Sequence, residues 1–283
     1  MSDNFPTKDL KVALFPMPIT WGVKAANIDT LLEAMPQIYP QIDLLILPET
    51  FSTGFPSGMG KEEVRKLAER NTGKTIDLVK ALAKEYGMGI CGSYVAETGG
   101  LLFNRAFFIE PGGGEFFADK KHLFTMAGED KVFRAGDSRL NVRFRGWNIS
   151  MVICYDVRFP VWCRNSTDPY QLLIAVANWP QQRIDAWEQL LRARAIENQA
   201  YVCGVDCLGT DPQGNIYNGS SQALDFLGKD AGVRCEIDLK WRSGDTEYVK
   251  APIIYANLEA AKLDRFRTKF AAWRDADPFY IPS

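Results

Sequence analysis

Hydrophobic and polar positions along the chain predict strands and helices in alternation. A short apolar segment at residues 11–15 precedes apolar positions that recur at helical spacing over residues 27–38. Residues 43–47 have the uninterrupted apolar character of a buried parallel strand. A second amphipathic helix is predicted at residues 74–86, followed by a strand at residues 88–95. The N-terminal third therefore predicts β-α-β units.

The rest of the chain continues the alternation and adds a hairpin. Glycines at positions 112–114 predict a tight turn between two strands, which indicates sheets of mixed direction. About a dozen strands exceed one ordinary sheet, and two helix-covered sheets would accommodate them. No repeat or flexible linker interrupts the pattern, so we expect one domain over residues 1–283. The remaining predicted strands lie at 103–110, 115–119, 147–153, 171–177, 201–206, 221–226 and 233–239, and the remaining helices at 183–199 and 258–266.

Charge and the N-terminal sequence narrow the range of partners. The 33 Lys and Arg residues are scattered among 35 Asp and Glu residues, so no basic patch indicates nucleic acid. The N-terminal decapeptide lacks the apolar segment of a signal peptide, and the longest aliphatic runs, 44–47 and 172–177, are too short to span a membrane. We therefore expect a cytoplasmic protein that binds a small molecule and neither nucleic acid nor a membrane.

Six cysteines and a single histidine are the notable members of the composition. Cytoplasmic cysteines stay reduced, so their even number predicts no disulfides. Cys203 and Cys207 have the spacing of half a zinc site, but no second pair completes it, and we expect no metal. Together with Cys91, Cys163 and Cys235, they are expected to serve as small packing residues.

Cys154 occupies a different kind of position. It follows the apolar run at residues 149–153 and precedes a turn into a predicted short helix. A side chain at a strand exit can point into a cleft, where free backbone N–H groups bind an anion. Position alone leaves a nucleophilic role and a packing role equally open.

Two further charged residues lie at predicted strand ends. Glu49 follows the strand at residues 43–47, and open α/β sheets bind ligands at such ends. Lys120 follows the strand at residues 115–119. Taken singly, Glu49 is equally well explained as a solvated carboxylate, and Lys120 with Lys121 as a surface charge pair.

Taken together, the three segments resemble a known family. LPETF around Glu49, DKKHLF around Lys120 and VICYDVRFP around Cys154 are similar, in the same chain order, to the three catalytic motifs of the nitrilase (carbon–nitrogen hydrolase) superfamily. The resemblance extends over nearly the whole chain and is greatest to the omega-amidase branch. It includes NWPQQR at 178–183, the segment 187–206 and FAAWRDADPF at 270–279.

The resemblance implies a mechanism without metal or organic cofactor. Cys154 would attack an amide carbonyl to form a thioester, and Glu49 would act as general base in both halves of the cycle. Lys120 and the backbone N–H of Tyr155 would stabilise the oxyanion, and Glu129 would orient the lysine and the base. The single histidine, His122, is expected to be structural.

The omega-amidase resemblance also implies a substrate class. Short dicarboxylic monoamides such as 2-oxoglutaramate and 2-oxosuccinamate need a cation for the distal carboxylate and a partly apolar wall. Phe55 and Trp179 are candidates for the wall, and Arg183 or Arg158 for the cation. An ion pair between Arg158 and Asp156, or a neighbouring carboxylate, stays open as the alternative.

The family further implies a four-layer α-β-β-α sandwich that assembles as a homodimer or larger homo-oligomer. The aromatic tail within residues 268–283 would cross to the partner or fold back on its own subunit. Two other functions stay open. The same residues could hydrolyse an N-carbamoyl amine, a nitrile or a deaminated peptide amide, or the chain could be a catalytically idle interaction module. Retention of all the reactive groups argues against the idle module.

Overall fold

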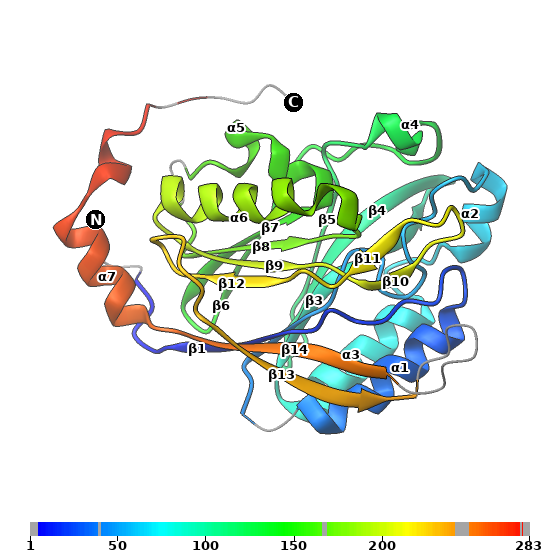
Figure 1. Ribbon diagram of the computed structural model, residues 1–283, viewed down its shortest axis with the longest axis horizontal. Helices are drawn as coiled ribbons and strands as arrows, with labels where there is room; N and C mark the ends of the chain where they lie inside the picture. The colour runs from blue at the N-terminus through cyan, green and yellow to red at the C-terminus, as the bar shows by residue number, and fades with distance from the viewer. Residues whose placement is uncertain (1–4, 39–40, 166–168, 241–248, 278, 280–283) are drawn as a thin grey trace.

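Two β-sheets packed face to face form the centre of the structure (Figure 1). The computed structural model describes residues 5–38, 41–165, 169–240, 249–277 and 279. One sheet has seven strands in the order β13-β14-β1-β2-β3-β4-β5, and the other has five in the order β12-β9-β8-β7-β6. The seven strands are β1 (Leu10–Leu14), β2 (Leu44–Ile46), β3 (Gly89–Thr98), β4 (Leu101–Ile109), β5 (Glu115–Asp119), β13 (Gly232–Leu239) and β14 (Val249–Leu258).

The five-stranded sheet has a parallel centre and antiparallel edges. Its strands are β6 (Leu140–Phe144), β7 (Trp147–Ile153), β8 (Leu172–Val176), β9 (Tyr201–Val205) and β12 (Gln222–Leu224). β7, β8 and β9 run parallel, whereas β6 and β12 pair antiparallel to their neighbours. In the other sheet β1, β2 and β3 run parallel. The mixed sheets expected from the hydrophobic pattern are therefore confirmed.

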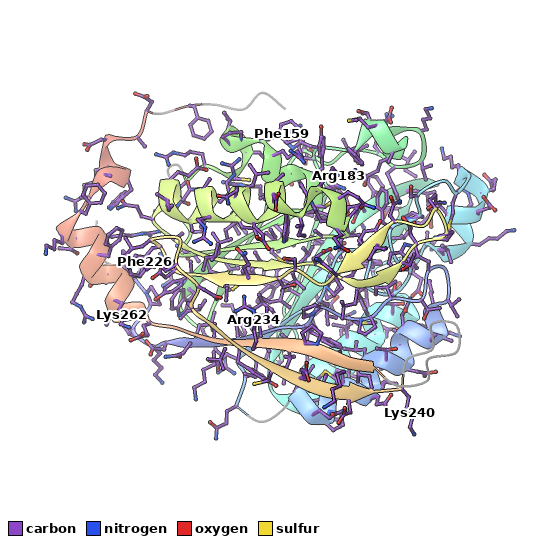
Figure 2. All side chains as sticks on the ribbon, viewed as in Figure 1. Phe159, Arg183, Phe226, Arg234, Lys240 and Lys262 are labelled. Carbon is purple, nitrogen blue, oxygen red and sulfur yellow. The ribbon has the colours of Figure 1, made fainter. Side chains whose placement is uncertain are left out.

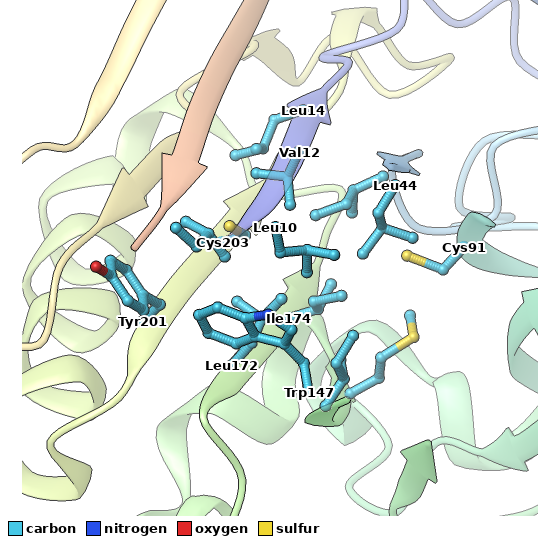
Figure 3. Close-up of a cluster of buried hydrophobic side chains, with 14 of the residues drawn as sticks. Leu10, Val12, Leu14, Leu44, Cys91, Trp147, Leu172, Ile174, Tyr201 and Cys203 are labelled. Carbon is cyan, nitrogen blue, oxygen red and sulfur yellow. The ribbon is translucent and has the colours of Figure 1, made fainter. Parts of the chain in front are cut away.

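Helices cover the outer face of each sheet. The helices α1 (Lys24–Ile38) and α3 (Lys74–Tyr86) lie on the seven-stranded sheet, and α6 (Ile184–Asn198), with the short α5 (Pro160–Cys163), lies on the other (Figure 1). The layer between the sheets is apolar. Leu10, Val12 and Leu44 from one sheet meet Trp147, Leu172 and Ile174 from the other (Figure 3). These four layers confirm the α-β-β-α sandwich.

The sequence pattern missed several elements. It did not predict β14, and it assigned Leu258 to a helix, whereas Leu258 ends β14 and α7 spans Ala260–Lys269. Pro252 argues against a strand in the sequence pattern, because proline removes a ladder hydrogen bond and is disfavoured in the middle of a sheet. Pro252 lies beyond the ladder with β1, which covers residues 254–258 of β14, and stands opposite Glu236 of β13. The other missed elements are α2 (Lys61–Leu67), α4 (Glu129–Val132), β10 (Leu208–Thr210) and β11 (Ile216–Asn218).

The first residues of the C-terminal segment pack against their own chain. Gln199, which follows α6, donates to the carbonyl of Phe270 at 2.9 Å and accepts from the N–H of Trp273 at 3.1 Å. A short 3-10 helix, η4 (Ala272–Asp275), follows. Residues 278 and 280–283 of the expected dimer-crossing tail lie outside the described residues.

Several parallel strands direct their carboxyl ends to one region of the sandwich. β2 ends at Ile46, β7 at Ile153 and β8 at Val176, and the chain leaves each strand in a loop or 3-10 turn. This arrangement brings polar residues of both sheets together. Within the described segments, no helix is long and apolar enough to cross a membrane.

Candidate active site

The three residues of the sequence motifs converge on one cavity. Glu49 follows β2, Lys120 follows β5, and Cys154 opens the 3-10 turn η2 (Cys154–Arg158) after β7. All three line a cavity of about 640 Å³. Two strand ends of the seven-stranded sheet and one of the five-stranded sheet therefore supply a carboxylate, an ammonium group and a thiol to the same space.

The backbone is strained where two of these residues are presented. Cys154 has a φ of 47°, and Thr50, directly after Glu49, has a φ of 43°. Both lie in the left-handed region, which is uncommon for residues other than glycine and clusters at functional sites. Tyr155 lies in the first turn of η2, where backbone N–H groups have no partner inside the helix. These N–H groups could bind an anion that forms beside the Cys154 thiol.

A buried lysine lies between two buried glutamates. Lys120 Nζ is 3.0 Å from Glu49 Oε1 and 3.0 and 2.9 Å from the two carboxylate oxygens of Glu129. All three side chains are at most 1% exposed. Unpaired charges at this depth would cost several kcal/mol each, so the three groups depend on one another. Glu129 does not line the cavity but supports Lys120 from behind.

Neighbouring amides complete the hydrogen bonding of Glu49. Asn104 Nδ2 in β4 donates to Glu49 Oε1 at 2.7 Å, and Asn104 Oδ1 accepts from the hydroxyl of Ser93 in β3. The backbone N–H of Asn178 donates to Glu49 Oε2 at 2.8 Å. Both carboxylate oxygens of Glu49 are therefore held in place by groups from both sheets.

Contacts within this cluster shift the pKa values of Lys120 and Glu129. Burial alone would lower the pKa of Lys120, but the negative charges of Glu129 and Glu49 outweigh it, and the pKa is raised. Burial raises the pKa of Glu129; Lys120 opposes this shift and Glu49 adds to it. These two carboxylates therefore favour the charged form of Lys120.

The Cys154 thiol is strongly disfavoured from ionising. Burial raises its pKa well above the ordinary value of 9.0, and the charge of Glu49 adds to the effect. Lys120 opposes it without reversing it. The resting thiol is consequently neutral, and the proton must leave as the sulfur reacts.

The remaining residues expected in the site also line the cavity. These are Phe55, Tyr155, Arg158, Trp179 and Arg183. The ring of Phe55 faces Lys120, with Nζ 5.5 Å from the ring centroid. Arg158 lies over the ring of Trp179 at 4.8 Å, and Arg183, at the start of α6 (Figure 2), lies over Phe124 at 5.5 Å. The cavity thus combines aromatic walls with two guanidinium groups.

Neither arginine is neutralised by a carboxylate of the described residues. The alternative ion pair between Arg158 and Asp156 does not form, because Asp156 accepts from the backbone N–H of Ile153 and from His122 instead. His122 Nδ1 lies 2.8 Å from Asp156 Oδ1, and the imidazole stacks on Phe159. His122 does not line the cavity and connects the Lys120 loop to the Cys154 turn, as its expected structural role requires.

The other thiols are outside the cavity lining. Cys91, Cys163, Cys203 and Cys207 are buried, as expected for packing residues. Cys235 was expected to be buried too, but it is exposed because it lies on the edge strand β13. Among the described residues, no group of three or more His, Cys, Asp or Glu side chains is arranged to hold a metal ion.

Sequence reasoning missed the residues that hold Glu49. Asn178 was part of the NWPQQR motif but was given no role, and Asn104 was not singled out. Asn104 and Arg105 interrupt the apolar run of β4, and such an interruption is a detectable signal because buried polar side chains need partners. Tyr217 and Asn215, which line the cavity from the missed β10–β11 hairpin, were also overlooked.

Comparison with known proteins identifies the family. The carbon–nitrogen hydrolase family model matches residues 11–260, and the chain belongs to this family. It is 37% identical to the omega-amidase YafV of Escherichia coli, over 96% of this chain and 98% of that protein. It is 30% identical to the 2-oxoglutaramate amidase of Bacillus subtilis, over 81% of this chain and 91% of that protein.

A solved structure agrees with this assignment. A carbon–nitrogen hydrolase superfamily protein from Xanthomonas campestris, which has an arsenic adduct in its active site, superposes with a TM-score of 0.85. It is 35% identical and covers 97% of this chain and 99% of its own. The expected superfamily, its omega-amidase branch and an amidase enzyme are confirmed.

The raised pKa of Cys154 leads to a testable expectation. The ultraviolet absorbance difference between the wild-type protein and Cys154→Ser reports the thiolate of this residue. We expect no rise as the pH increases from 5 to 8, because burial and Glu49 hold the pKa above its ordinary value of 9.0. An absorbance step near neutral pH would instead demonstrate a preformed thiolate.

Proposed function

We propose that this protein is an omega-amidase that hydrolyses the terminal amide of short dicarboxylic monoamides, namely 2-oxoglutaramate and 2-oxosuccinamate. The products are the 2-oxo acid and ammonia. One observation carries the proposal: the cavity holds a thiol, a carboxylate and a lysine at one place, and two arginines in its wall that no carboxylate of the described residues neutralises. The omega-amidase and 2-oxoglutaramate amidase among its relatives support the same substrate class.

In the first half of the reaction, Cys154 is the nucleophile. Its sulfur attacks the amide carbon while Glu49 accepts the thiol proton, so that no free thiolate is needed in the resting enzyme. The carbonyl π electrons move to oxygen, and the oxyanion is stabilised by Lys120 and the Tyr155 N–H. Glu49 then returns the proton to the amide nitrogen, the C–N bond breaks, and ammonia leaves a thioester behind.

In the second half, water replaces ammonia. Glu49 takes a proton from water, whose oxygen attacks the thioester carbon and forms a second oxyanion at the same donors. The C–S bond breaks, the carboxylic acid leaves, and the proton returns to Cys154. The two carboxylate oxygens of Glu49 are held by Lys120, Asn104 and Asn178, so the base keeps one orientation in both halves. Glu129 acts by positioning Lys120.

The charges of the cavity favour an anionic, keto-bearing substrate. Arg158 and Arg183 supply two cations, with Phe55 and Trp179 as the apolar walls for a short carbon chain. Among the described residues that line the cavity, Glu49 is the one carboxylate, and it is bound to Lys120. An α-ammonium group would therefore find no counter-ion, which favours 2-oxoglutaramate over glutamine.

The reaction is tested by ammonia release from a panel of amides. We expect 2-oxoglutaramate and 2-oxosuccinamate to react faster than glutamine, N-carbamoyl amines and nitriles. Cys154→Ala should lower turnover roughly 10³-fold or more, because no other group can form the thioester. Intact-mass analysis after rapid quenching should show the acyl adduct on Cys154. If the panel gives neither Cys154-dependent turnover nor an adduct, the enzyme function is refuted.

The carboxylate-binding role of the arginines has its own test. Loss of a charge-assisted hydrogen bond should raise the KM for 2-oxoglutaramate about tenfold in Arg158→Met or Arg183→Met, with a smaller effect on kcat. Butyramide, which has no distal carboxylate, should be unaffected. Arg134→Met is the control, because Arg134 is exposed and does not line the cavity. An unchanged KM in both cavity variants would exclude this pair as the clamp.

We also propose one catalytic domain that acts in the cytoplasm as a homodimer. A single domain is supported by the pairing of β1 with β14, which joins the two ends of the chain in one sheet. Exposed Phe270, at the start of the 268–283 tail, supports a partner contact. Light scattering should give twice the mass of one chain, and removal of residues 268–283 should lower it. A full-length monomer would contradict the dimer.

A further inference from the structure

A further buried carboxyl group, that of Asp206, lies behind the proposed catalytic base. Asp206 follows β9 directly and is 0% exposed. Its Oδ1 accepts the backbone N–H of Trp179 at 2.7 Å, whereas its Oδ2 is buried and has no hydrogen-bond partner among the described residues. Asp206 also forms no ion pair with a described residue, in contrast to Glu49 and Glu129.

This environment suits a carboxylic acid and not a carboxylate. A buried charge without a cation or a full set of donors is expensive, so the group takes up a proton instead. Burial raises the pKa of Asp206 well above its ordinary value; the Trp179 and Cys207 N–H groups oppose the shift, and Glu49 adds to it. The proton neutralises the oxygen that lacks a partner.

Asp206 is connected to the base by a short chain of contacts. The Trp179 N–H that it binds belongs to the residue after Asn178. Asn178 donates its backbone N–H to Glu49 Oε2 at 2.8 Å and its side-chain amide to the carbonyl oxygen of Glu49 at 2.6 Å. Asp206 is anchored in turn, because its own N–H donates to the hydroxyl of Ser221 at 2.9 Å.

We propose that Asp206 is an uncharged positioning residue that fixes the Asn178–Trp179 segment and thereby the orientation of Glu49. The inference rests on the proposed role of Glu49 as base. Its neutrality matters because an ionised Asp206 would add a second uncompensated negative charge beside Glu49 and oppose formation of the oxyanion. Asp206 itself does not line the cavity and touches no substrate.

Two substitutions test whether Asp206 acts as an uncharged residue that positions the Asn178–Trp179 segment. Asp206→Asn keeps an acceptor for the Trp179 N–H and is uncharged at every pH. We expect its kcat to stay within about twofold of wild type. The acid limb of its kcat/KM plotted against pH should lie at the same pH as in the wild type. Asp206→Leu removes the acceptor, and we expect kcat to fall about 10- to 100-fold with KM little changed, because the base is misplaced.

The protonation state has a direct spectroscopic readout. Infrared spectra at pH 7 should contain the carbonyl band of a protonated carboxyl group that is absent from Asp206→Asn. Thermal unfolding of each variant establishes that it is folded, and Asp206→Ala replaces Asp206→Leu if the larger side chain prevents folding. A shifted acid limb or a large loss of kcat in Asp206→Asn, or no such infrared band, would overturn the proposal.

The test of Asp206 does not depend on the omega-amidase assignment. The kinetic measurements use whichever amide of the panel gives Cys154-dependent ammonia release. If none does, the proposed function fails by itself, and the pH dependence of Cys154 alkylation by iodoacetamide reports the same positioning. Asp206→Asn should then leave the alkylation profile unchanged, whereas Asp206→Leu should alter it. An altered profile in Asp206→Asn would refute the neutral role.

Discussion

Lys120 is a buried cation, and the arrangement around it depends on satisfying its charge. Two glutamates bind it, and their oxygens need donors that one sheet cannot supply alone. Asn104 comes from the seven-stranded sheet and Asn178 from the end of β8 in the five-stranded sheet. The site therefore exists only when the two sheets are packed against each other, and the stability of the sandwich is coupled to the geometry of the base.

The same cluster explains why this chemistry uses a neutral thiol. Burial disfavours a thiolate of Cys154 in the resting state, and the net negative charge of one lysine and two glutamates beside it adds to the effect. A carboxylate base that accepts the proton during attack avoids this cost. A further buried charge at Asp206 would make the imbalance worse, and its unpartnered oxygen is consistent with the neutral acid. Arg158 and Arg183 place further positive charge in the cavity wall, where they would face the proposed substrate.

Particular residues indicate how far sequence reasoning reached. The three motif residues and the four proposed substrate contacts all line one cavity. They could be found from the sequence because short motifs and strand ends are local features of the chain. The roles of Asn104 and Asn178 were missed, because their partner Glu49 is 55 and 129 residues away along the chain. Pro252 concealed the strand β14, and Cys235 was misjudged because an apolar strand pattern does not distinguish the centre of a sheet from its edge.

By itself the sequence determined the alternation of strands and helices, the family, and the three reactive groups, because hydrophobic periodicity and short motifs are properties of neighbouring residues. Only the tertiary structure decided which groups neutralise one another. It pairs Asp156 with His122 and places Glu129 behind Lys120. Among the residues that the structure describes, it gives Arg158 no carboxylate partner and buries Asp206 without a cation. Such pairings depend on the packing of two sheets, since the charge and hydrogen bonding of a buried group are set by residues distant in the chain.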